Sequence, residues 1–314
     1  MHHLIIGGAG FIGSNLANLL AKSGENVQVV DNLSNGNQSF LEPLSQIKLL
    51  VGDVNQKSTW KKIEENLRGK EVFIWHLAAN SDIQKGATDT EFDFQNTLKT
   101  TLSVIENMDQ FKVKGIVFAS SSAVYGEVNQ YPSESDSLDP VSFYGTSKLA
   151  SENFLKIKCK ISGTPLWIFR FANVVGTPST HGVILDFCKK LNADMTILNV
   201  LGNGSQTKAY IHVDDLLNVI SKVTIKFPQG GTWNLGPLDE GISVREIAEL
   251  VCTCLSPTAK ISYGESTKGW FGDISHIVLN SKRLAEDLDS DLPSSKNAVV
   301  KAISEICKQV EINH

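Results

Sequence analysis

Two side chains that could transfer a proton stand four residues apart in the sequence, Tyr144 and Lys148. They open a helical pattern that continues through Leu149, Ala150 and Phe154, so both should lie on one face of a helix. A neighbouring ammonium favours the phenolate and lowers a phenol pKa that is ordinarily about 10. The spacing therefore predicts that Tyr144 acts as a base whose pKa Lys148 depresses. The alternative is a surface pair, because this spacing also arises by chance in helices.

Three hydroxyl side chains, Ser120, Ser121 and Ser122, follow the β-branched run over residues 115–119. A serine at the carboxyl end of a strand can hydrogen-bond a substrate hydroxyl. The alternative is a polar turn whose hydroxyls only satisfy the backbone.

Three glycines, Gly7, Gly10 and Gly13, follow the apolar run 4–6 and precede a helical pattern over 11–22. Gly7 permits a tight turn, Gly10 lets the backbone approach phosphates, and Gly13 allows the helix to pack closely on the strand. The amides at the start of that helix would then face an anion. The segment predicts a dinucleotide site, although its spacing is G-x-x-G-x-x-G and a glycine-rich turn can be only a turn.

An acidic residue, Asp31, ends the second apolar run about twenty residues after the glycine loop. A carboxylate there can accept hydrogen bonds from an adenosine ribose and would repel a 2′-phosphate, which favours NAD over NADP. The alternative is that Asp31 only caps the turn 32–36. Together the glycine loop, the serine and the Tyr/Lys helix predict a site for hydride transfer to or from an alcohol carbon.

These residues are spaced along an alternation of strands and helices. The strands are expected near residues 3–6, 27–31, 47–51, 72–77, 115–119 and 165–171. Such alternation predicts an α/β fold with a doubly wound parallel sheet of Rossmann type, whose ligands lie beyond the carboxyl ends of the strands.

Beyond residue 175 the pattern loosens, which predicts a smaller mixed α/β lobe. We expect an NAD-binding domain over residues 1–172, to which residues 207–235 return. The remaining residues, 173–206 and 236–314, should form the nucleotide-sugar-binding lobe.

The composition excludes several classes of partner. The 314 residues are 41% hydrophobic with a net charge of −5, and no basic stripe predicts a nucleic-acid partner. No apolar run is long enough to span a membrane and no secretory signal precedes the first strand, so the expected location is the cytoplasm. The five scattered cysteines form no C-x-x-C pair, and no metal site is expected.

The chain resembles the extended short-chain dehydrogenase/reductase superfamily, in its NAD-dependent epimerase/dehydratase group, along most of its length. The segments that carry the resemblance are 7–13, 31–34, 52–54, 76–79, 120–126, 144–148, 170–176 and 210–214. The resemblance implies a homodimer built through helices near 89–110 and 144–160. The cofactor-binding residues expected from the motifs and the resemblance are Gly7, Gly10, Phe11, Ile12, Gly13, Asp31, Asn32, Ser34, Gly36, Asp53, Val54, Leu77, Ala78, Ala79, Asn96, Ser120, Tyr144 and Lys148.

Within that group, the residues after the catalytic hydroxyl separate the reaction types. By its position before Tyr125, the hydroxyl is that of Ser121, and the next two residues are Ser122 and Ala123. Sugar-nucleotide dehydratases and UDP-glucuronate decarboxylases carry an acidic group there. This chain therefore lacks an acid or base that either reaction needs. A 4-epimerase remains, with Ser121, Tyr144 and Lys148 as catalytic residues.

The chain is most similar to the branch of UDP-glucose (UDP-galactose) 4-epimerases, which are isomerases of carbohydrate metabolism. The expected reaction is interconversion of UDP-galactose and UDP-glucose through transient oxidation at C4 by tightly bound NAD. The alternatives are 4-epimerisation of UDP-N-acetylglucosamine or UDP-glucuronate, an NADH-dependent reductase of 4-keto sugars, and a non-catalytic NAD-binding sensor.

The resemblance also implies the residues that bind the UDP-sugar. They are Ser121, Ser122, Asn173, Val183, Lys208, Tyr210, Trp270 and Asp273. Two arginines commonly clamp the diphosphate in better-known relatives, and their positions here are taken by Lys208 and Trp270. Nucleotide binding would then depend on stacking, backbone amides or neighbours such as Lys268. At the position that limits sugar size stands Ile277, which leaves room for an N-acetylhexosamine.

Overall fold

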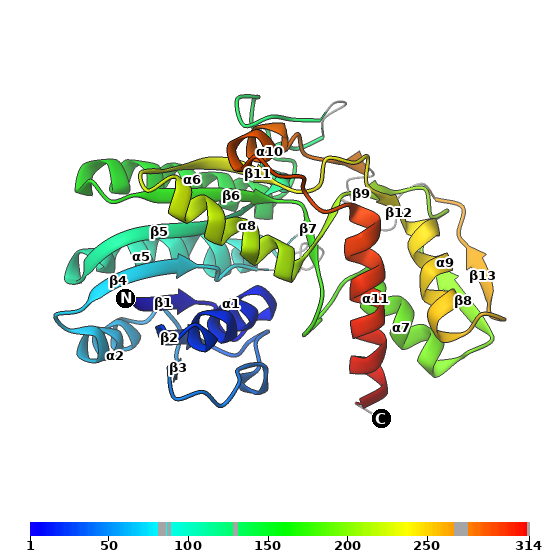
Figure 1. Cartoon of the computed structure of the whole chain (residues 1–314), viewed down its shortest axis with the longest axis horizontal. Helices are drawn as coiled ribbons and strands as arrows, with labels where there is room; N and C mark the ends of the chain where they lie inside the picture. The colour runs from blue at the N-terminus through cyan, green and yellow to red at the C-terminus, as the bar shows by residue number, and fades with distance from the viewer. Residues whose placement is uncertain (81–85, 87–88, 128–130, 267–275, 313–314) are drawn as a thin grey trace. The chain divides into compact units, whose positions relative to one another are not determined.

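The structure is a computed structural model, and it describes residues 1–80, 86, 89–127, 131–266 and 276–312 (Figure 1). The chain divides into two compact units. The first consists of Met1–Gly126, Leu138–Arg170 and Ser221–Trp233, and the second of Glu127–Ser137, Phe171–Ile220 and Asn234–His314. The residues that were expected in the first domain but belong to the second unit in this division are 127–137, 171–172, 207–220 and 234–235.

The first unit is built on a sheet that has seven strands among the described residues, in the order β11-β6-β5-β4-β1-β2-β3. The strands are β1 (His2–Ile6), β2 (Asn26–Asp31), β3 (Ile47–Val51), β4 (Glu71–His76), β5 (Lys112–Ser121), β6 (Leu166–Phe171) and β11 (Gly230–Leu235). Strand β1 pairs in parallel with both β2 and β4. On their other sides, β2 pairs in parallel with β3 and β4 pairs in parallel with β5. The expected doubly wound sheet of Rossmann type is confirmed, and each expected strand overlaps an observed one.

Helices connect these strands, as Figure 1 shows. They are α1 (Phe11–Lys22), α2 (Lys57–Leu67), α4 (Thr90–Asp93), α5 (Lys99–Asn107), α6 (Phe143–Ser162), the π-helical stretch η2 (Phe94–Leu98), and the 3₁₀ turns η1 (Gln38–Phe40), η3 (Met108–Gln110) and η4 (Ser122–Val124). Alternation along β1 sends Leu4 and Ile6 into one cluster with apolar residues of α2, α5 and α6. This face of the sheet is therefore buried by α2, α5 and α6.

Helix α6 carries the Tyr/Lys pair and has a defined start and end. The Ser142 hydroxyl at its N-cap accepts a hydrogen bond from the Gly145 amide at 3.1 Å. The helix ends at Gly163, whose φ of 68° is a left-handed conformation that suits glycine. These two signals fix where Tyr144 and Lys148 lie along the helix.

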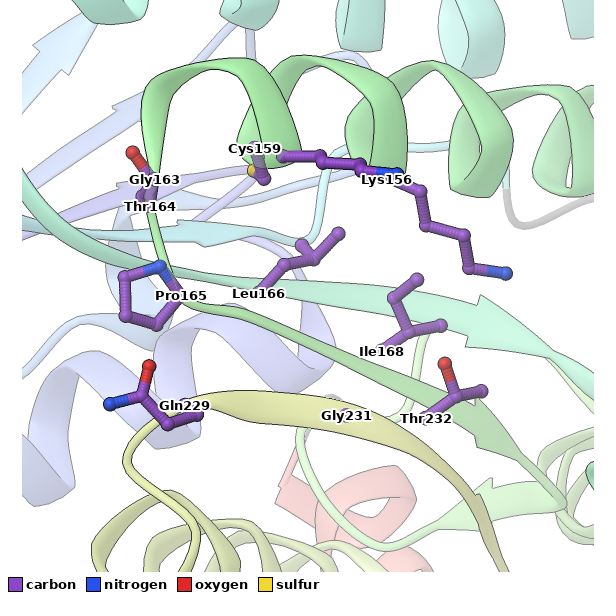
Figure 2. A pocket seen from close by; sticks show the side chains of 11 residues that line it. Lys156, Cys159, Gly163, Thr164, Pro165, Leu166, Ile168, Gln229, Gly231 and Thr232 are labelled. Atoms are coloured by element: carbon purple, nitrogen blue, oxygen red, sulfur yellow. The ribbon is translucent and has the colours of Figure 1, made fainter.

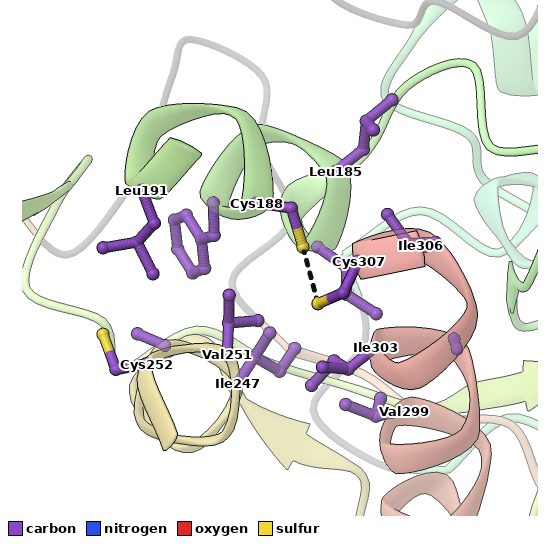
Figure 3. Close-up of a cluster of buried hydrophobic side chains, with 14 of the residues drawn as sticks. Leu185, Cys188, Leu191, Ile247, Val251, Cys252, Val299, Ile303, Ile306 and Cys307 are labelled. Carbon is purple, nitrogen blue, oxygen red and sulfur yellow. Dashed lines mark hydrogen bonds between the residues drawn. The ribbon is translucent and has the colours of Figure 1, made fainter. Parts of the chain in front are cut away.

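The second unit contains a core of its own, formed where α7 (Val183–Ala193), α9 (Val244–Leu255) and α11 (Ser295–Ile312) meet (Figure 3). Its other elements are α8 (Val213–Lys226), which continues into the first unit, α10 (Lys282–Leu288), and the strands β7 (Asn173–Val175), β8 (Ile197–Val200), β9 (Thr207–Lys208), β10 (Tyr210–His212), β12 (Ile242–Ser243), β13 (Lys260–Tyr263) and β14 (His276–Ile277). They form small sheets, with β7 beside β10, β8 beside β13, and β9 between β12 and β14. A mixed α/β lobe was expected and is confirmed.

The cysteines are free thiols. Four of them are buried and Cys254 is exposed. The Sγ atoms of Cys188 and Cys307 lie 3.7 Å apart where α7 meets α11, as the dashed line in Figure 3 marks. Among the described residues, no helix combines the length and apolar character needed to cross a membrane.

Candidate active site

The glycine loop at the end of β1 has the close contacts that its residue types predict. Gly7 has a φ of 81°, and a Cβ atom there would lie 2.7 Å from the backbone nitrogen of Ala78. A Cβ atom on Gly13 would lie 2.2 Å from the carbonyl oxygen of Gly7, so α1 starts in contact with the loop. Gly10 is the N-cap of α1 and brings no side chain to the first turn, which holds Phe11 and Ile12. The loop fits the phosphates of a dinucleotide, because backbone amides can approach an anion there.

The Asp31 carboxylate joins the glycine loop to the turn that follows β2. Its Oδ2 accepts a hydrogen bond from the Ala9 amide at 2.9 Å, and its Oδ1 accepts one from the Leu33 amide at 2.8 Å. The same turn holds Asn32, Ser34 and Gly36. Each carboxylate oxygen has a second lone pair, so Asp31 can support the loop and still accept a ribose hydroxyl. The capping role and the ribose role are thus compatible.

The other expected cofactor residues of the first unit follow β3 and β4. Asp53 accepts a hydrogen bond from the Asn55 amide at 2.8 Å, and Val54 is buried. Leu77, Ala78 and Ala79 are half-buried at the carboxyl end of β4. Their places agree with the rule that ligands of such sheets bind beyond the carboxyl ends of the strands.

Asn96 lies in η2, and its side-chain amide donates to the Phe92 carbonyl at 2.8 Å. A buried carboxylate that the sequence analysis did not single out, Asp93, stands at the start of this stretch and accepts a hydrogen bond from the Asn80 side chain at 2.8 Å. Its negative charge acts on Tyr144 and raises the pKa of the phenol.

The two expected catalytic hydroxyls meet, although they come from different elements. Ser121 ends β5 and is the N-cap of the turn η4. Its Oγ accepts a hydrogen bond from the Ala123 amide at 3.2 Å. The Ser121 hydroxyl also acts on the Tyr144 phenol and lowers its pKa. Ser122 is buried in η4. A substrate oxygen placed beside Ser121 would therefore also lie beside the phenol.

Lys148 completes the group. Its Nζ lies 5.8 Å from the centre of the Tyr144 ring and 4.9 Å from that of Phe118, and it donates a hydrogen bond to the Ala119 carbonyl. Burial lowers the pKa of this ammonium to about 7, while the charge of Glu152 raises it.

The expected low pKa of Tyr144 is not what the protein alone shows. Burial raises the pKa of the phenol to about 12; the hydrogen bond with Ser121 lowers it and the charge of Asp93 raises it. Desolvation thus sets the direction of the shift, opposite to the lowering expected from Lys148. A phenolate at this position needs further positive charge beside it.

A buried network beside the catalytic group was missed from the sequence. Glu152 accepts hydrogen bonds from the Ser120 hydroxyl at 2.6 Å and from the Arg170 guanidinium at 2.8 and 3.0 Å. Arg170 in turn donates to the Tyr125 hydroxyl at 2.8 Å. Ser120, expected at the cofactor, therefore has a partner inside the protein. Glu152 follows Lys148 by four residues, and this spacing was the available signal.

The expected substrate residues of the second unit lie in its small sheets and at the start of α7. Asn173 begins β7, and its side chain donates to the Ala209 carbonyl at 3.1 Å. Val183 is the first residue of α7, after Gly182, and Lys208 is half-buried in β9. Tyr210 is buried in the hydrophobic core of this unit. Trp270 and Asp273, together with Lys268, lie outside the described residues.

One cluster in the second unit has the composition of a metal site. His212, Asp214 and Glu305 bring ligand atoms within 4.8 Å of one another. The Lys301 ammonium lies 2.6 Å from the Asp214 carboxylate, and His212 Nε2 lies 3.0 Å from Glu305. Because a lysine already supplies the positive charge, the geometry favours an ion-pair network.

A surface groove of about 350 Å³ lies in the first unit, at the end of α6 and the start of β6 (Figure 2). It begins at Pro165 and Leu166, where β6 starts, so the groove reaches the amino end of this strand. The groove is therefore separate from the glycine loop, which follows the carboxyl end of β1. Lys156 lines it and also lies 3.1 Å from Glu152.

Comparisons with known proteins give a consistent result. The sequence matches the model of the NAD dependent epimerase/dehydratase family over residues 3–236. It is 31% identical over 232 residues to a UDP-glucose 4-epimerase of Lacticaseibacillus casei, covering 68% of each chain. It is 29% identical over 300 residues to a UDP-glucose 4-epimerase of Halalkalibacterium halodurans, covering 89% of this chain and 87% of that protein.

A solved structure of a UDP-galactose 4-epimerase is similar to this chain along almost its whole length. The two are 31% identical, and the match covers 99% of this chain and 100% of the other with a TM-score of 0.86.

Proposed function

This chain belongs to the NAD dependent epimerase/dehydratase family, and we propose that it interconverts UDP-galactose and UDP-glucose by inverting carbon 4 of the sugar. Its cofactor is NAD. The observation that carries the proposal is that three side chains come together: the Ser121 hydroxyl acts on the Tyr144 phenol and lowers its pKa, and the Lys148 ammonium lies 5.8 Å from the centre of the phenol ring. Together these three side chains can remove a proton from a sugar hydroxyl and later return it to the same oxygen.

The glycine loop and the residues after β2, β3 and β4 would hold the cofactor. When bound, oxidised NAD supplies a hydride acceptor for C4 of the sugar and a positive charge that favours the Tyr144 phenolate. That charge is what a phenol with a pKa near 12 lacks in the protein alone.

The three catalytic side chains divide the proton chemistry among them. Tyr144 takes the proton of the 4-hydroxyl while C4 is oxidised, and Ser121 donates a hydrogen bond to the same oxygen. Lys148 stabilises the phenolate through its charge. After the 4-keto sugar has turned its other face to the site, Tyr144 returns the proton to the oxygen as C4 is reduced, so no second redox substrate is consumed.

The residues next to Ser121 support epimerisation over elimination of water. Removal of water from the sugar needs an acid and a base near C5 and C6. Ser122 and Ala123 supply neither, and both are buried in the turn η4. The proposed reaction needs only the one proton that Tyr144 moves.

The second unit would bind the UDP part of the substrate. Asn173 starts β7, Val183 starts α7 and Lys208 lies in β9. The positive charge of Lys208 would attract the diphosphate. A lysine offers a point charge without the two-pronged geometry of arginine. We therefore expect the diphosphate to be held in part by backbone amides.

We also propose that the chain forms a homodimer through α6. Phe154, Ile157 and Ile161 are 48%, 63% and 79% exposed, and their spacing places them on one stripe of the helix. Three large apolar side chains on one stripe are typical of an interaction surface.

Proton NMR of the purified protein with UDP-galactose tests the function. The mixture is followed first without added NAD and then with catalytic NAD, and the anomeric signals of UDP-glucose should appear. Tyr144→Phe, purified in parallel, controls for a contaminating enzyme.

The outcome separates the candidate sugars. Conversion by the wild-type protein only would support the proposal. A protein that binds NAD and leaves UDP-galactose unchanged would exclude that substrate, and the same assay would then be repeated with UDP-N-acetylglucosamine and UDP-glucuronate.

A further inference from the structure

We propose that the buried Glu152–Arg170 ion pair positions the catalytic residues: it holds the turn that carries Ser121, and its carboxylate favours the ammonium form of Lys148. The inference rests on the proposed function for the roles of Ser121 and Lys148. Neither Glu152 nor Arg170 touches the reacting atoms, so both would be positioning residues.

The pair itself is fully buried and has good geometry. Arg170 Nε donates to Glu152 Oε1 at 3.0 Å and Arg170 Nη2 donates to Oε2 at 2.8 Å, while Glu152 and Arg170 are 0% and 2% exposed. Desolvation offsets much of the attraction in such a pair, and apolar residues of similar volume often stabilise a core as well. The contacts that the pair makes with its neighbours are therefore more informative than its stability.

Those contacts lead to both ends of the catalytic turn. On one side, the Ser120 hydroxyl donates to Glu152 Oε1 at 2.6 Å, and Ser120 directly precedes Ser121. On the other side, Arg170 Nη1 donates to the Tyr125 hydroxyl at 2.8 Å, and Tyr125 directly follows η4. The ion pair therefore holds the turn from before and after the catalytic hydroxyl.

Glu152 also faces Lys148 from the next turn of the same helix. Lys148 is 2% exposed, and burial lowers its pKa to about 7 even though the negative charge of Glu152 raises it. Lys148 donates to the Ala119 carbonyl, one residue before Ser120, so the ammonium and the carboxylate contact adjacent residues of β5. Without the carboxylate, this buried amine would lose its proton below neutral pH.

The other charged and titratable groups around Lys148 do not replace Glu152. Tyr144 is a phenol with a raised pKa, and the pKa of His76 is lowered to about 3 by burial and by Lys148 itself, so the imidazole is neutral. Asp93 acts on Tyr144, and Arg170 would add positive charge if Glu152 were removed. Lys156 contacts Glu152 from the groove in Figure 2, 3.1 Å away.

The test measures the protonation of Lys148 directly, without using activity. Protein labelled with ¹³C in its lysines is titrated by NMR, and the ε-carbon signal of Lys148 is assigned by its loss in Lys148→Met. In Glu152→Gln the midpoint should fall by about 1 pH unit or more, as expected when an opposite charge close to an amine is removed. Glu152→Asp keeps the negative charge, so its midpoint should lie close to that of the wild type.

Two further variants separate this role from a structural one. Glu106→Gln removes an exposed carboxylate from α5 and should leave the midpoint unchanged. If Glu152→Gln does not fold, Glu152→Gln with Arg170→Gln removes both charges, and its midpoint should still lie below that of the wild type. A midpoint that stays within about 0.3 units in every folded variant lacking Glu152 would overturn the proposal.

Activity supplies the second measurement. If the wild-type protein epimerises UDP-galactose, we compare kcat at pH 8 with kcat at pH 6 in both proteins. This ratio should be about fivefold lower in Glu152→Gln than in the wild type, because lowering the Lys148 pKa by one unit removes the ammonium mainly at pH 8. A variant that is only less stable would lose activity equally at both pH values, and this result would also count against the proposal. If the wild type converts no UDP-sugar, the proposed function fails while the NMR midpoint still decides the role of Glu152.

Discussion

The carbonyl oxygen of Gly7 lies where a side chain on Gly13 would have to be, because a Cβ atom there would come within 2.2 Å of it. Both partners of this contact are backbone, in the loop and in α1, so neither can move away without shifting the helix from the strand. Gly10 differs, since a Cβ atom on it would lie 3.4 Å from the same oxygen.

This difference predicts separate outcomes for two alanine variants. Gly13→Ala should lower the free energy of unfolding by about 1–3 kcal/mol, as overpacking does, and should weaken NAD binding. Gly10→Ala should cost less than about 1 kcal/mol of stability and still weaken NAD binding, because its methyl group would stand where phosphates approach. Urea denaturation and calorimetric titration with NAD measure the two effects. Equal loss of stability in both variants would contradict the assigned geometry.

Replacing the phenol should remove the proton transfer and little else. Tyr144→Phe should lower kcat by about 10² to 10⁴, the usual range for acid–base assistance. NAD affinity should change much less, because the glycine loop and Asp31 are untouched. Steady-state kinetics with UDP-galactose, with NAD titration as the control, measures this. A variant with nearly wild-type kcat would exclude Tyr144 as the base.

Burial of Lys148 should make the stability of the NAD-free protein depend on pH. In the folded state its pKa is lowered to about 7 from an ordinary 10.5, so between these values the unfolded chain binds the proton and the folded chain does not. Stability should therefore rise with pH across this window, by up to about 1.4 kcal/mol per unit from this one group. Urea unfolding from pH 7 to 10 should give a shallower slope in Lys148→Met than in the wild type. Parallel curves would show that Lys148 titrates alike in both states.

The exposed stripe of α6 predicts the assembly of the chain. Ile157→Asp should give a monomer, because a charge would have to be buried at the dimer interface. Multi-angle light scattering of the eluting protein measures the mass. Lys160→Ala, at an exposed position in the last turn of the same helix, should leave the mass unchanged. A wild-type protein that elutes as a monomer at micromolar concentration would refute the proposed dimer.

The fold could be predicted from local signals. The β-branched runs, the glycine loop and the start of α1 depend on residues that are neighbours in the chain, and the helix expected over 11–22 was observed as Phe11–Lys22. The serine run after β5 and the Tyr/Lys spacing predicted one shared site, since strand ends and helix faces follow fixed periods, and the Ser121 hydroxyl does act on the pKa of Tyr144.

The features that could not be predicted from the sequence depend on the surroundings of a residue in the folded protein. The pKa of Tyr144 is set mainly by burial, which a four-residue spacing does not reveal. Arg170 meets Glu152 and Tyr125 only once β6 and β5 are neighbours in the sheet. Tyr210 was assigned to substrate from a motif, and its burial among apolar residues became visible only in the folded second unit.

The three side chains of α6 to which we assign roles, Tyr144, Lys148 and Glu152, succeed one another at intervals of four residues. Each residue turns an α-helix by about 100°, so one added or deleted residue between them would swing the later groups to another side of the helix. Evolution can therefore replace side chains along this stretch, but it cannot change its length without losing the site. Insertions in homologues should begin only after Gly163, where the helix has ended.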